Sequence, residues 1–152
     1  MDFITQNLLT VLILLPVIGA ALTLAYQIVS KQEDQIKWIT LGFTLLNFLA
    51  SLALLSKTEL PGASGFSFEQ NIPWIHAINT NYHIGVDGLS LWLVILTTLM
   101  MPIAVLSSWN SVAKRRTAFY VFLLLLESAM IGVFVSLDLL VFYLFFEASL
   151  IP

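Results

Sequence analysis

Apolar residues in this chain fall in long uncharged stretches, separated by short segments that are charged or rich in turn formers. About 20 apolar residues are enough for an α-helix to cross the roughly 30 Å hydrocarbon layer of a bilayer. Spans are predicted at about residues 8–29, 38–56, 89–109, 117–135 and 139–152. The pattern predicts an all-α fold over 1–152: one membrane domain, a polytopic transmembrane helical bundle with four complete spans and a truncated fifth.

One connection is much longer than the others. It runs from Lys57 to Val86 and contains turn formers and aromatic residues such as Pro61, Pro73 and Trp74. Tryptophan and tyrosine gather where a membrane meets water, and proline and glycine punctuate loops. We expect a partly ordered segment that lies on the membrane surface.

The last apolar stretch is short for a membrane span. Residues 139–152 provide only about 21 Å of helix, against about 30 Å of hydrocarbon. A carboxylate at Pro152 would end within or just below the hydrocarbon, where an unpaired charge is costly. We therefore expect the sequence to be a fragment, with further apolar spans in the intact protein.

The cations lie mostly on one side of the predicted bundle. Lys57 falls in a connection on one side, and the other side holds Lys31, Lys37, Lys114, Arg115 and Arg116. Cytoplasmic connections carry the excess of lysine and arginine in membrane proteins. The distribution predicts that the N-terminus lies outside.

The composition supports a membrane protein and excludes several functions. Hydrophobic residues make up 59% of the chain and charged residues 10%, whereas about a quarter of a soluble domain is charged. The net charge of −3 gives no basic surface for nucleic acid, and the absence of cysteine excludes disulfides and iron–sulfur clusters. We expect no cofactor, no metal and no nucleic-acid partner.

Two acidic residues lie inside predicted spans. Glu127 and Glu147 are each ten residues from Leu137 at the turn between the last two spans, or about 15 Å deep in the membrane. Desolvation there favours the protonated carboxyl, and a cation brought nearby would favour proton release. Both residues are candidates for proton transfer, Glu147 more than Glu127 because its neighbours are wholly apolar. The alternative is that both are protonated and only hydrogen-bond neighbouring helices.

Three other polar residues have structural interpretations. Asn47, in the middle of the second span, favours a hydrogen bond between helices. Asp87 and Asp138 each precede an apolar span, where a carboxylate accepts hydrogen bonds from the free N–H groups of a helix.

Two motifs resemble a known family. The sequence His83-Ile-Gly-Val-Asp-Gly-Leu-Ser-Leu91 resembles the G-x-D-G-L-S motif of antiporter-like subunits of respiratory complex I, NADH:quinone oxidoreductase. Glu127-Ser-Ala-Met-Ile-Gly-Val-Phe134, with Asp138-Leu-Leu140 and Phe146-Glu-Ala-Ser-Leu-Ile-Pro152, is similar to the subunit M (chain 4) group in particular. The similarity covers roughly the last 70 residues.

The resemblance implies a proton-translocating subunit that couples electron transfer to H⁺ movement, in the inner (plasma) membrane of a bacterium. Its partners would be the bilayer and other membrane subunits of the complex, with NADH and quinone bound only elsewhere. In this family the residue matching Glu147 pairs with a lysine on a later broken helix and takes part in proton transfer. The residue matching Glu127 occurs in many bacterial members.

Two alternatives remain. A subunit of a multi-chain Na⁺/H⁺ antiporter or of a membrane-bound hydrogenase shares the same ancestry. A non-catalytic membrane scaffold or degenerate fragment is an alternative of another class, favoured by the spans that are missing from this chain.

Overall fold

The computed structural model describes residues 7–30, 34–57, 65–75, 80–112 and 115–152. The helices and strands in these ranges are α2 (Leu8–Ser30), α3 (Ile36–Lys57), β1 (Ser67–Ile75), β2 (Thr80–Val86), α4 (Gly88–Ser107), α5 (Arg116–Val135) and α6 (Leu139–Leu150). The predicted helical membrane fold is confirmed, and each helix begins and ends close to the predicted residues. In the described ranges, α2, α3, α4 and α5 are long and apolar enough to cross a membrane, and α6 is shorter.

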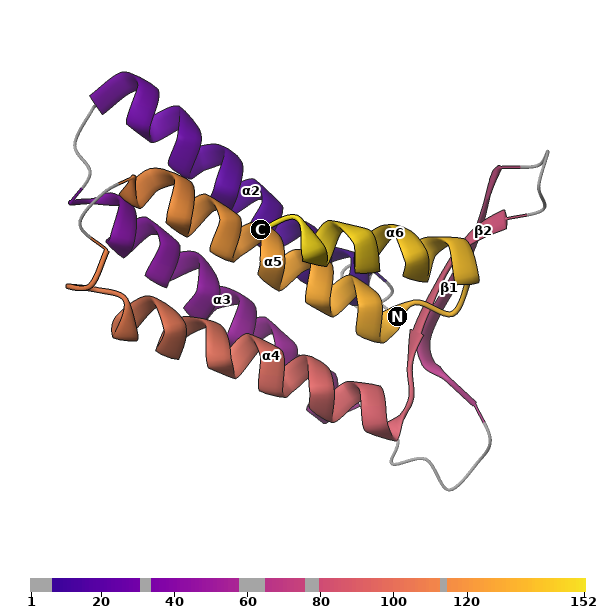
Figure 1. The fold of residues 1–152 in the computed structure, drawn as a ribbon. Coiled ribbons are helices and arrows are strands. Elements are labelled where there is room, and N and C mark those ends of the chain that lie inside the picture. The colour runs from indigo at the N-terminus through magenta and orange to yellow at the C-terminus, as the bar shows by residue number, and fades with distance from the viewer. Residues whose placement is uncertain (1–6, 31–33, 58–64, 76–79, 113–114) are drawn as a thin grey trace.

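The helices alternate in direction along one axis (Figure 1). α5 is the central helix, since it packs against α2, α3, α4 and α6. The strands lie at one end of the bundle, which we call the hairpin end. The α4–α5 connection lies at the opposite end, which we call the basic end (Figure 1).

The basic end holds described cations in defined contacts. The Arg116 Nη1 atom lies 2.9 Å from Asp34 Oδ1. The Lys37 Nζ atom lies 4.9 Å from the centre of the Trp109 ring, a cation–π distance. Lys31 and Lys114, which also entered the orientation prediction, lie outside the described residues.

Two helices begin at the predicted aspartate caps. Asp87 Oδ1 accepts a hydrogen bond of 2.7 Å from the backbone N–H of Ser90, and Asp138 Oδ1 accepts one of 2.9 Å from Leu140 N–H. The bond from Ser90 stabilises the charged carboxylate and lowers the pKa of Asp87 below its ordinary value. Both structural interpretations are confirmed.

A side chain of α5 bonds to the backbone of α2 beside a proline. Pro16 lies inside α2 and has no N–H to donate to the carbonyl of Leu12. The Ser128 hydroxyl of α5 donates a 2.7 Å hydrogen bond to the next carbonyl, that of Ile13. This bond joins α5 to α2 at the residue next to the carbonyl that Pro16 cannot serve.

The long connection contains an antiparallel two-stranded sheet, β1 with β2, where the sequence predicted only a partly ordered segment. Glu69 and His83 make a side-chain hydrogen bond across it, with 2.7 Å between Oε1 and Nε2. The backbone N–H of Leu137 donates to the carbonyl of His83 at 2.9 Å, which attaches the sheet to the α5–α6 turn.

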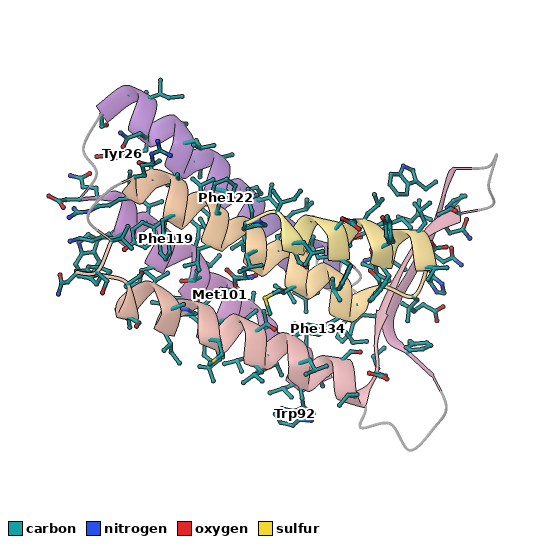
Figure 2. All side chains as sticks on the ribbon, viewed as in Figure 1. Tyr26, Trp92, Met101, Phe119, Phe122 and Phe134 are labelled. Atoms are coloured by element: carbon teal, nitrogen blue, oxygen red, sulfur yellow. The ribbon has the colours of Figure 1, made fainter. Side chains whose placement is uncertain are left out.

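The outer faces of the helices are apolar. Trp92 on α4 is 62% exposed, and its side chain points away from the bundle (Figure 2). Every described helix has exposed large apolar side chains, such as leucines on α3 and phenylalanines on α5. Such a surface is stable against lipid and unfavourable against water.

Candidate functional site

Glu127 is the buried carboxyl in the centre of the bundle. It lies on α5 and its side chain is completely buried. Oε1 accepts a 2.8 Å hydrogen bond from Asn47 Nδ2 on α3, and Asn47 is also completely buried. The prediction that Asn47 makes a hydrogen bond between helices is confirmed.

Only two of the four polar side-chain atoms in this pair have a partner among the described residues. Among the described residues, Glu127 Oε2 and Asn47 Oδ1 have no partner. Both unpartnered atoms are acceptors when Glu127 is ionised, whereas a proton on the carboxyl adds a donor to the pair. The geometry therefore favours a protonated Glu127.

The lack of a cation near Glu127 also favours its protonated form. In the part of the chain that the structure describes, the contacts between acidic and basic side chains are Glu69–His83 and Asp34–Arg116, and they lie at opposite ends of the bundle. Neither supplies a cation to Glu127. An isolated carboxylate in an apolar interior is strongly destabilising, and such groups take up a proton instead.

Asn47 belongs to a row of buried polar side chains along α3, which we call the polar stripe. Its members are completely buried and face the interior: Thr40, Thr44, Asn47 and Ser51. Residues three and four apart lie on the same face of a helix, so the row extends for about 16 Å along the helix axis.

The polar stripe meets α4 toward the hairpin end. The hydroxyls of Ser51 and Thr98 lie 2.7 Å apart. Ser51 also lies 2.7 Å from the carbonyl of Phe48, and Thr98 lies 3.0 Å from the carbonyl of Ile95. Both hydroxyls therefore have protein partners.

Glu147 lies on the other side of α5, on helix α6. α6 packs on α5 where the Phe145 ring covers Gly132: a Cβ added to Gly132 would lie 2.3 Å from Phe145 Cδ1. Glu147 follows Phe145 by two residues, about 200° around the helix, and is exposed in the described chain. Tyr143, one turn earlier, interacts with the Glu147 carboxyl.

The depth of Glu147 follows from the same contact. Because Gly132 faces Phe145 in an antiparallel helix pair, Glu147 lies near the level of Met130, about 4.5 Å along the axis from Glu127. α6 ends about halfway along the bundle (Figure 1). Glu147 is thus surrounded by exposed apolar side chains such as Phe146 and Leu150.

The structure therefore places the two predicted carboxyls at neighbouring depths but in different surroundings. Glu127 points into the bundle and Glu147 points out of it, so they do not form a pair. The hydroxyls around Asn47 were not predicted as part of the site. Their signal was the 4-3-4 spacing of Thr40, Thr44, Asn47 and Ser51 in an otherwise apolar helix.

The fold is that of a multi-pass helical membrane protein, with two carboxyl groups part-way along its apolar helices. No protein-family model matches the chain. It is 41% identical to NADH-quinone oxidoreductase subunit M of Rhodobacter capsulatus over 97% of its length. It is 39% identical to NADH-ubiquinone oxidoreductase chain 4 of Mycosarcoma maydis over 95% of its length, and 37% identical to NAD(P)H-quinone oxidoreductase chain 4 1 of a Picosynechococcus species over 100%.

The chain spans 28%, 30% and 28% of the length of these three relatives, respectively. These three relatives are subunit M, or chain 4, of NADH-quinone, NADH-ubiquinone or NAD(P)H-quinone oxidoreductases. The resemblance seen in the sequence motifs is confirmed.

Proposed function

We propose that this chain is part of a proton-translocating membrane subunit of NADH:quinone oxidoreductase, in which Glu147 and Glu127 carry protons. The observation that supports the proposal is that two separate carboxyls lie near mid-depth of an apolar bundle, with no cation beside either among the described residues. Intramembrane acidic groups with this placement are typical of proton relays. The names of the homologues support the same function.

Glu147 is suited to a switch because its face of α6 is open to other protein. A cation that another part of the protein brings close would favour the ionised carboxylate and release its proton. When the cation withdraws, the apolar surroundings favour the protonated form and the carboxyl takes up a proton again. Electrostatic coupling of this kind requires no redox centre in this chain.

The remaining parts of the proposal concern the assembly. The partners are the other membrane subunits of the complex, and NADH and quinone are bound by other subunits. The membrane is the inner (plasma) membrane of a bacterium. The positive-inside rule places the basic end in the cytoplasm.

The test is Glu147→Gln in the full-length subunit within the assembled complex. Glutamine keeps the size of the side chain and removes the exchangeable proton, so NADH-driven proton pumping in inverted membrane vesicles should fall sharply. Glu69→Gln is the matched control, since Glu69 is exposed on β1 and should leave pumping unchanged.

Unchanged pumping in Glu147→Gln, with normal amounts of assembled complex, would contradict the role of Glu147. If Glu127→Gln also pumped normally, the chain would serve as a membrane scaffold. The relatives named above are quinone oxidoreductase subunits, which favours this function over an antiporter or hydrogenase subunit.

A further inference from the structure

The polar stripe on α3 has two unlike halves on either side of Asn47. Toward the hairpin end, Ser51 and Thr98 have protein partners, as described above. Toward the basic end, Thr40 Oγ1 is buried with no partner among the described residues. The unpartnered oxygens Glu127 Oε2 and Asn47 Oδ1 lie between these halves.

The spacing on the basic side fits single water molecules. Side chains three or four residues apart on a helix have Cβ atoms about 5–6 Å apart. Among the described residues, Thr40 Oγ1 and Asn47 Oδ1 have no partner, so neither bonds directly to the Thr44 hydroxyl between them. Two O–H···O bonds in series through one water span about 5.5 Å. Buried polar groups without a protein partner are the usual sites of ordered water.

We propose that Thr40, Thr44 and Asn47 line a hydrated column through which Glu127, protonated at rest, exchanges its proton with the basic end of the bundle. The proposal rests on the proton-carrying role proposed above. The step is a proton exchange at Oε2: this oxygen releases its proton to one water of the column and accepts a proton from another, and no bond other than O–H changes. Asn47 is a positioning residue, because its amide holds Oε1 at 2.8 Å and leaves Oε2 for the water.

A purely structural role for the polar stripe predicts different behaviour. The Thr44 hydroxyl lies 3.1 Å from the carbonyl of Leu41, so a threonine can be accommodated without water. Thr40 is the decisive residue, because removing an unpartnered buried hydroxyl breaks no protein hydrogen bond. If the polar stripe only joins helices, Thr40→Val should therefore leave proton pumping and the exchange of the Glu127 proton unchanged.

The experiment compares Thr40→Val and Thr44→Val with Thr98→Val in the assembled complex. Thr98 is also completely buried but lies on the hairpin side, so the same chemical change serves as the control. Two quantities are measured: NADH-driven proton pumping, and the rate of hydrogen–deuterium exchange of the Glu127 carboxyl. The exchange is followed by the shift of its infrared C=O band in D₂O, and the band is identified by its loss in Glu127→Gln.

We expect both valine variants on the basic side to slow the exchange and the pumping several-fold, with Thr98→Val unaffected. Thr44→Ser, which restores a hydroxyl, should recover most of the rate. Asn47→Leu should move the C=O band to higher frequency, because the carbonyl loses its donor.

Three results would contradict the proposal of a hydrated column. These are exchange at the original rate in Thr40→Val and Thr44→Val, exchange slowed only in Thr98→Val, or no band from a protonated Glu127. Failure of the proposed function has a different result, namely normal pumping in both Glu127→Gln and Glu147→Gln, whatever the exchange rates are.

Discussion

Asn47 and Glu127 stabilise each other, because each has a polar side chain buried in an apolar bundle and each is the other's hydrogen-bond partner. A buried polar atom that loses its partner costs about 1–3 kcal/mol, whereas replacing both partners by apolar groups is nearly neutral. The pair is therefore costly to break from one side and tolerant of joint replacement. This asymmetry separates its contribution to stability from its role in proton transfer.

The prediction at this scale concerns leucine replacements of the pair. Asn47→Leu should lower the free energy of unfolding by about 1–3 kcal/mol, and the double variant Asn47→Leu/Glu127→Leu should recover part of that loss. Thermal unfolding of the purified protein in lipid measures both effects. A double variant less stable than Asn47→Leu alone would show that the hydrogen bond does not connect these residues.

Among the elements, the helices could be predicted closely from the sequence, because an uncharged run of sufficient length has no stable alternative inside a bilayer. The β1–β2 sheet could not. Pro73 lacks the N–H needed in a sheet interior and normally argues against a strand. It is tolerated here because β1 is an edge strand of a two-stranded sheet.

The positions of Glu127 and Glu147 along the helix axis were also predictable, but the directions in which their side chains point were not. Counting residues from Leu137 fixed how far Glu127 and Glu147 lie from the turn. α6, however, is apolar around most of its circumference, so no pattern indicated which face packs on α5. The contact between Gly132 and Phe145 decides this, and it became visible only in three dimensions.

The α5–α6 contact gives a prediction at the scale of elements. Gly132→Ala should destabilise the protein by about 1–3 kcal/mol, because the added methyl overlaps the Phe145 ring. Gly42→Ala is the control: nothing lies within 4 Å of its added Cβ, and alanine is favoured over glycine inside a helix by about 1 kcal/mol. Equal unfolding temperatures for the two variants would contradict the close helix contact.

For the molecule as a whole, the orientation across the membrane is open to a direct test. The sequence contains no cysteine, so one introduced residue labels this chain at a chosen position. Asn71 on β1 and Ser111 at the basic end are both exposed. With the basic end in the cytoplasm, a membrane-impermeant maleimide should label Asn71→Cys in intact cells and Ser111→Cys only in inverted vesicles.

Labelling in the reverse pattern would place the N-terminus inside and would mean that the described cations do not determine the topology. Labelling of both positions in intact cells would instead indicate that the reagent had crossed the membrane. A cytoplasmic protein with an introduced cysteine controls for this.

The opposite directions of the two glutamates have a consequence for assemblies of different make-up. The side chains around Glu127 belong to helices of the same polypeptide. We therefore expect its proton affinity to stay the same when this chain is placed in a different complex. Glu147 faces whatever neighbour the host complex supplies. A chimaera would therefore inherit the behaviour of one acid from the donor and that of the other from the recipient.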